Sequence, residues 1–219
     1  MFGMDKYRHW LVMSVVFSAV CWATISDDLF TDDFFKQIQQ RYGEDRLEDF
    51  SDWRDTIAGG SALSDMDRLH LANQFANRRI RFVSDNDHWQ KSDYWATPLE
   101  SLGSKGGDCE DFAIFKYFTL KAMGVDESKM RLMYVRALLI NEPHMVLIYF
   151  EDPKAMPLVL DNLKTQILPA SQRRDLKPVY SFNGQGLWLA KAQGLGSNKP
   201  TSGGTKNWTD LVNRIENGE

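Results

Sequence analysis

The stretch GGDCEDFAIFKYFTLKAMG, residues 106–124, decides the expected fold. Its part from 112 to 123 is apolar on nearly every side, which is typical of a helix buried in the centre of a domain. Gly124 follows at the position where a glycine often ends a helix. The sequence therefore predicts a buried central helix that begins close to Cys109, directly after a glycine-rich turn.

Helices are predicted ahead of this segment. One is expected over 33–42 and another over 65–81, where Ser64 provides an N-cap and apolar residues recur with a period near 3.6. Residues 45–57 have a mixed pattern, for which no element is predicted. Residues 84–107 are predicted to form a long polar loop, whose three large aromatic residues indicate that it is fastened to the rest of the domain.

Strands are predicted after the central helix. Strand-like runs occur at residues 132–140, 145–150, 158–160, 179–182 and 187–189. A short helix is expected near 208–215. Helices followed by strands predict an α+β fold, in which an antiparallel sheet packs against the central helix.

The N-terminus has the features of an export signal. A basic segment is followed by an apolar run over 10–20 and by small residues over 21–23, as in sequences that a signal peptidase cleaves. The apolar run is too short to span a bilayer comfortably, although an uncleaved anchor is the alternative interpretation. We therefore predict export, with residues 1–23 as a signal peptide cleaved after Ala23.

The remaining residues, 24–219, are enough for one domain with a substantial core. A Gly/Ser/Lys-rich segment near 194–206 is predicted to be flexible. The formal net charge is −4, with both signs interspersed. Because no basic stripe is present, no nucleic-acid partner is expected.

Removal of the signal peptide would also remove Cys21 and leave Cys109 as the one cysteine. A lone thiol in an exported protein is a buried small apolar residue, an intermolecular cross-linking point or a reactive nucleophile. A helix N-terminus lowers a thiol pKa, whereas the carboxylates of Asp108, Glu110 and Asp111 raise it. A helix end contributes only about 0.3–1 kcal/mol per exposed charge, so three carboxylates outweigh it unless an imidazolium or a bound cation neutralises them.

His144 and Asp161 are the candidate partners of this thiol. His144 directly precedes a predicted strand, and Asp161 directly follows the next one. If the two strands pair as an antiparallel hairpin, both residues lie at the same sheet edge, where Asp161 can orient the imidazole. The alternatives are a structural histidine and a turn-forming aspartate. His70 is explained by its place in the predicted helix over 65–81, and His88 is a second choice of base.

Together these segments resemble the bacterial transglutaminase-like cysteine proteinases of the LapG type. The resemblance is carried by GGDCEDFA at 106–113, PHMVL at 143–147 and VLDN at 159–162, and it extends to DYWATP at 93–98. It implies a papain-like, transglutaminase-like core. It also implies a thiol endopeptidase whose catalytic residues are Cys109, His144 and Asp161.

The same resemblance implies dependence on Ca²⁺, held by Asp108, Glu110 and Asp111. Without a metal, Asp108 would cap the helix and the other two acids would complement its dipole. The family further implies a periplasmic location and a large surface adhesin as substrate, cut near its N-terminus to promote biofilm dispersal. A LapD-type inner-membrane receptor that responds to cyclic di-GMP is the expected partner.

Two other functions use the same residues. A transglutaminase or related acyl transferase would pass the thioester to an amine instead of water. A non-catalytic calcium-binding interaction module would bury Cys109 as a structural residue. The products formed separate the first alternative from a protease, and the reactivity of the thiol in the native protein tests the second.

Overall fold

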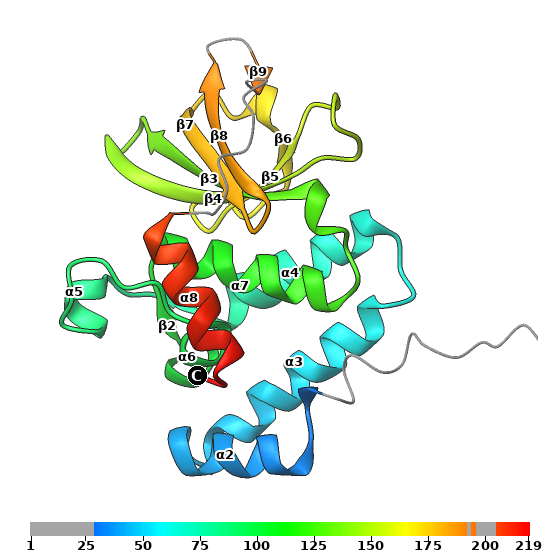
Figure 1. Ribbon diagram of the computed structural model, residues 1–219, viewed down its shortest axis with the longest axis vertical. Helices are drawn as coiled ribbons and strands as arrows, with labels where there is room; N and C mark the ends of the chain where they lie inside the picture. The colour runs from blue at the N-terminus through cyan, green and yellow to red at the C-terminus, as the bar shows by residue number, and fades with distance from the viewer. Residues whose placement is uncertain (1–28, 192–193, 196–204) are drawn as a thin grey trace, which may run out of the picture.

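The computed structural model describes residues 29–191, 194–195 and 205–219. The predicted signal peptide, 1–23, lies outside these residues, as does the 196–204 part of the segment that we expected to be flexible. Figure 1 shows a sheet as one layer with the helix α7 beneath it, and the helices α2 and α3 farther from the sheet. This arrangement confirms the predicted α+β class.

The central helix is α7 (Cys109–Ala122), and it begins three residues before the apolar run. Its buried side chains lie on every face, and they include Phe112, Phe115, Tyr117 and Leu120. Asp108 precedes the helix as its N-cap, and the Asp108 backbone N–H donates to Oδ2 of Asp111 over 3.1 Å. The predicted buried helix with Cys109 at its start is therefore confirmed.

The main sheet has seven strands in the order β6-β5-β4-β3-β7-β8-β9, and every neighbouring pair is antiparallel. The strands are β3 (Met130–Ala137), β4 (Glu142–Tyr149), β5 (Leu158–Leu160), β6 (Leu168–Pro169), β7 (Leu176–Asn183), β8 (Gly186–Lys191) and β9 (Gly194–Leu195). One face packs on α7 through residues such as Leu132, Leu147 and Phe182. The strand predicted over 132–140 ends at Ala137, because the chain turns there and Asn141 takes a left-handed conformation with φ of 57°.

Three longer helices lie between residues 32 and 79, ahead of α7. They are α2 (Asp32–Tyr42), α3 (Leu47–Gly60) and α4 (Asp65–Arg79), with a 3-10 turn, η1 (Glu44–Arg46), between the first two. The helix predicted over 65–81 is confirmed up to Arg79, with Ser64 as its cap. The segment without a predicted element is α3, which buries Phe50, Trp53 and Ile57.

The predicted loop over 84–107 is partly wrong, because it contains two short helices. They are α5 (Asp85–His88) and α6 (Pro98–Ser104), and the latter begins with a capping box made by Thr97 and Glu100. A small parallel ladder joins β1 (Arg81–Phe82) to β2 (Gly106–Gly107). This segment is fastened across the start of α7, as its aromatic content indicated.

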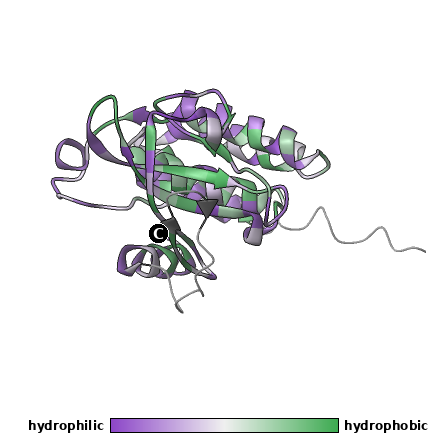
Figure 2. Ribbon diagram, turned by 90° about the horizontal axis from the view of Figure 1, so that it is seen from above, coloured by the Kyte–Doolittle hydropathy of each residue, from purple (hydrophilic) through white to green (hydrophobic). Residues whose placement is uncertain are grey.

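Two further 3-10 turns, η2 (Glu127–Lys129) and η3 (Ala170–Gln172), flank the strands, and the chain closes with α8 (Lys206–Glu216). The last helix confirms the one predicted near 208–215 and buries Trp208 and Leu211. Figure 2 shows hydrophobic residues gathered along the central strands, while the helices carry both hydrophobic and hydrophilic residues. Within the part of the chain that the structure describes, no helix has the length and apolar character needed to cross a membrane.

Candidate active site and acidic cluster

His144 and Asp161 meet at one edge of the main sheet. β4 and β5 pair antiparallel with Leu147 opposite Leu160, so the start of one strand lies beside the end of the other. Nε2 of His144 lies 2.8 Å from Oδ1 of Asp161. Both side chains are buried, with 3% and 1% of their surface exposed. The structure thus brings these two predicted residues together as a hydrogen-bonded pair.

Arg173 is a third member of this pair that sequence reasoning missed. Its Nη2 donates to Oδ2 of Asp161 over 2.6 Å, and its Nε and Nη2 also donate to the carboxylate of Asp175. Burial alone would raise the pKa of Asp161, but the hydrogen bonds from His144 and Arg173 outweigh it and lower the pKa to about 2. Asp161 is therefore ionised and held in one orientation.

Cys109 lies at the start of α7, against β4. The Met145 backbone N–H lies near its sulfur and favours the thiolate, which places the thiol beside the residue that follows His144. Its Sγ also lies 3.0 Å from Oε2 of Glu110. Among the described residues, no hydrogen bond joins the thiol directly to the imidazole. The pKa of the Cys109 thiol is raised, first by burial and then by the negative charges of Glu110 and Asp108.

The acids around Cys109 belong to a larger acidic cluster of five carboxylates. Asp108, Glu110 and Asp111 were predicted, and the structure adds Asp85 and Asp93 from the segment around α5. Three sets of side chains each place one possible ligand atom per residue within 4.8 Å of one another: Asp108 with Cys109 and Glu110, Asp85 with Asp93 and Glu110, and Asp85 with Asp108 and Asp111. Asp85 and Asp93 were not predicted as ligands, although Asp93 opens the DYWATP stretch of the family resemblance. Both lie in a turning segment that folds back to the helix start.

The chemistry of the acidic cluster fits a hard cation such as Ca²⁺. Oδ1 of Asp85 and Oδ1 of Asp108 are buried without a hydrogen-bond partner among the described residues. Burial raises the pKa of Asp108, Glu110 and Asp111, and repulsion by neighbouring carboxylates adds to it. Calcium binds several oxygen ligands, carboxylates above all, so it would both satisfy these oxygens and offset the repulsion.

Backbone donors hold two of these acids in place. The Tyr94 N–H donates to Oδ2 of Asp85 over 2.5 Å, and the Ala96 N–H donates to Oδ1 of Asp111 over 2.8 Å. Asp85 therefore has one oxygen bound to the chain, whereas Asp111, whose Oδ2 also accepts from the Asp108 N–H, has both oxygens bound. The segment around Tyr94 therefore contacts both Asp85 and Asp111, which come from the two parts of the chain that form the acidic cluster.

Comparison with known proteins agrees with this geometry. A family model described as bacterial transglutaminase-like cysteine proteinase matches residues 54–177. The chain belongs to this family. The matched residues include all five carboxylates, Cys109, His144, Asp161 and Arg173.

Solved structures support the assignment of this proteinase to the LapG type. LapG from Legionella pneumophila in an EGTA-treated form is 40% identical, with a TM-score of 0.72 over 84% of this chain and 96% of that one. A calcium-bound form of the same protein is 39% identical, with a TM-score of 0.72 over 85% and 99%. The curated protein sequences yield no significant match.

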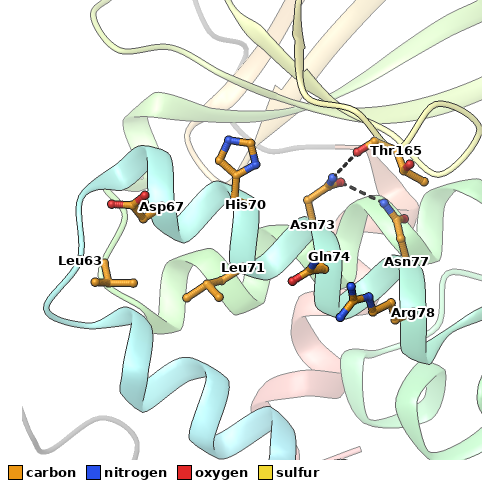
Figure 3. A pocket seen from close by; sticks show the side chains of 9 residues that line it. All are labelled: Leu63, Asp67, His70, Leu71, Asn73, Gln74, Asn77, Arg78 and Thr165. Atoms are coloured by element: carbon orange, nitrogen blue, oxygen red, sulfur yellow. Dashed lines mark hydrogen bonds between the residues drawn. The ribbon is translucent and has the colours of Figure 1, made fainter.

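Two further histidines, His70 and His88, lie within the described residues. The rings of His88 and Trp89 meet at a tilt of 45°, with centroids 4.3 Å apart. His70 projects from the exposed side of α4 into a groove of about 730 Å³ that contains none of the three proposed catalytic residues (Figure 3). Asn73 and Asn77 in this groove donate to the carbonyl oxygens of Thr165 and Asp161, over 2.7 and 3.1 Å. The groove wall therefore supports the loop that follows Asp161.

Proposed function

We propose that this proteinase is a calcium-dependent periplasmic endopeptidase with Cys109 as nucleophile, His144 as base and Asp161 as the residue that orients the base. Its substrate is the N-terminal region of a large surface adhesin, whose release promotes biofilm dispersal. The observation that carries the proposal is the buried His144–Asp161 pair, one residue from the backbone N–H that contacts the sulfur of Cys109. This is the arrangement that thiol proteases use to activate a cysteine.

The reaction follows from the positions of these residues. Asp161 engages Nε2 of His144, which leaves Nδ1 to take the proton of the Cys109 thiol. The thiolate then attacks a peptide carbonyl carbon, and the Cys109 backbone N–H at the start of α7 is a candidate donor to the oxyanion. His144 returns its proton to the leaving amine as the C–N bond breaks. Water activated by His144 then hydrolyses the thioester and restores the thiol.

Calcium is proposed as the cofactor on two grounds. One related LapG structure is described as calcium-bound and another as EGTA-treated. In this chain the ligands would be Asp108, Glu110 and Asp111, together with Asp85 and Asp93. When bound, the ion would supply positive charge beside the nucleophile. The residues themselves keep Glu110 within hydrogen-bonding distance of the thiol, so cation binding and thiol activation involve the same carboxylate.

The cellular setting is proposed from the sequence and the family. The basic and apolar segments of residues 1–23 support export to the periplasm. A LapD-type inner-membrane receptor that responds to cytoplasmic cyclic di-GMP would sequester the protease. Since the nucleotide acts on the receptor, this chain needs no nucleotide site of its own.

A cleavage assay tests the proposal. The purified protein is incubated with an N-terminal adhesin fragment, with calcium or with chelator, and the products are identified by mass spectrometry. We expect two peptide fragments in calcium, none in chelator, and none with Cys109→Ala, whose fold is checked by circular dichroism. Cleavage by Cys109→Ala would reject the nucleophile. Isopeptide or other amine-linked products would indicate an acyl transferase instead.

A further inference from the structure

The C-terminal helix α8 is anchored in the core by its apolar side. The Trp208 ring stacks on Phe118 with centroids 5.8 Å apart, and it meets Tyr117 edge-on at 5.3 Å. Leu211, three residues later, is fully buried. Because side chains three and four residues apart share one side of a helix, this anchoring fixes how the rest of α8 faces its neighbours.

Two polar side chains of α8 reach the segment 93–96. Nδ2 of Asn207 donates to Oδ2 of Asp93 over 2.9 Å. Arg214 donates to the Tyr94 hydroxyl over 2.7 Å and to the Trp95 carbonyl oxygen. Its guanidinium carbon also lies 4.7 Å from the centre of the Tyr94 ring. Three consecutive residues are therefore held by a helix more than 110 positions later in the chain.

The same short segment supports the acidic cluster from its other side. Asp93 belongs to the acidic cluster, and the N–H groups of Tyr94 and Ala96 donate to Asp85 and Asp111. Each residue from 93 to 96 thus contacts α8, the acidic cluster or both. A displacement of this segment would move Asp93 and withdraw donors from two other carboxylates.

We infer that α8 positions the cation site, with Arg214 and Asn207 as positioning residues that hold residues 93–96 in the conformation in which the five carboxylates converge. The inference rests on the calcium binding proposed above. Residues that support metal ligands from outside typically change metal affinity by about 10–100-fold when they are replaced. α8 therefore contributes to calcium affinity without offering a ligand of its own.

A purely structural role is the competing explanation for Arg214. Its Nη1 also donates to Oε2 of Glu100 over 2.9 Å, and Glu100 is buried. Loss of this ion pair would lower the stability of the protein whether or not a cation binds. Asn207 makes no such ion pair with the residues that the structure describes; its side chain donates to Asp93, which is exposed.

The test measures calcium affinity by isothermal titration calorimetry and thermal unfolding in chelator, on the purified protein. Asn207→Ala is compared with Asn213→Ala, an exposed residue of the same helix, and Arg214→Gln with the exposed Arg78→Gln. We expect Arg214→Gln to weaken calcium binding by about tenfold or more, and Asn207→Ala to weaken it severalfold with unchanged unfolding in chelator. Both controls should bind calcium as the unaltered protein does.

The outcomes separate this inference from the proposed function. If the unaltered protein binds no calcium, the proposed cofactor is wrong. If it binds calcium and both α8 variants bind it equally well, the positioning role is wrong. Should Arg214→Gln fail to fold, Asn207→Ala decides alone, and an affinity equal to that of Asn213→Ala overturns the inference.

Discussion

Sγ of Cys109 lies 3.0 Å from Oε2 of Glu110, so the proposed nucleophile and a proposed calcium ligand share a hydrogen bond. In this arrangement the carboxylate favours the protonated thiol, because a second negative charge beside it is unfavourable. A cation held by Glu110 would offset that charge. The contact therefore connects occupancy of the acidic cluster to the reactivity of the nucleophile.

Alkylation of Cys109 should accordingly depend on calcium. We expect iodoacetamide to modify the native protein faster in calcium than in chelator, by about tenfold for each unit by which the thiol pKa falls. Glu110→Gln removes the repelling charge, so in chelator it should react faster than the unaltered protein. The rate is followed by mass spectrometry on peptides containing Cys109. Equal rates for all three samples would contradict the coupling.

Arg173→Met should damage both stability and activity. The change leaves Asp161 buried with two of its three hydrogen bonds, those from His144 and from the Leu163 N–H. Breaking a buried ion pair from one side costs about 3–5 kcal/mol. Chemical denaturation should show a loss of that order, and adhesin cleavage should fall with it. Arg174→Met is the matched control, because Arg174 is the exposed neighbour. A wild-type unfolding free energy for Arg173→Met would show that the buried Asp161 does not need Arg173.

Lys116→Met should stabilise the protein. Lys116 is fully buried in α7, and its Nζ has no hydrogen-bond partner among the described residues. Burial lowers its pKa to about 7, while the charge of Asp161 opposes the change. In the unfolded chain the amine stays protonated up to a pH of about 10.4. Burying this lysine therefore lowers the free energy of unfolding most below pH 7, and the loss fades as the pH rises from 7 toward about 10.4.

The gain from Lys116→Met should therefore be larger at pH 6 than at pH 10. Its upper limit is about 1.4 kcal/mol for each unit by which the pKa is lowered. Urea denaturation at the two pH values measures it, with the exposed Lys177→Met as control. A gain that is the same at both pH values would mean that the folded protein does not hold this lysine in a neutral form.

Sequence was sufficient for the parts of the fold whose signal is local. The helix α7 is apolar all round, and Cys109, His144 and Asp161 stand at the ends of elements, so simple strand pairing predicts the pair that the structure shows. The helix α3 was missed although Phe50, Trp53 and Ile57 are spaced for one helical face. Asp49 interrupts that face, and its burial is possible only because Arg79 and Lys105 bind its carboxylate over 2.8 and 2.7 Å.

The parts of the site that were missed depend on contacts between distant segments. Arg173 follows Asp161 through an irregular connection, and nothing in its immediate neighbours indicates that it turns inward. Asp85 and Asp93 lie in a segment predicted to be a loop. The Ala96 N–H on Asp111 and the contacts of α8 with Asp93 and Tyr94 hold that segment at the helix start. Contacts between distant segments leave no periodic pattern in the sequence. Sequence patterns therefore predict where helices and strands end, and not which loops meet near those ends.

Gly107 lies against Asp111, so replacing it tests how tightly the acidic cluster is packed. A Cβ at this position would lie 2.6 Å from Cβ and 2.7 Å from Oδ2 of Asp111, closer than such atoms can approach. Gly107→Ala should therefore push the Asp111 carboxylate away from its donors, lowering stability by about 1–3 kcal/mol and weakening calcium binding. Gly59→Ala in α3 meets no atom within 4 Å, so helix propensity should stabilise it by up to about 1 kcal/mol. Denaturation and calorimetry on both variants measure these changes. Equal calcium affinity in the two would show that Asp111 can shift without loss of the site.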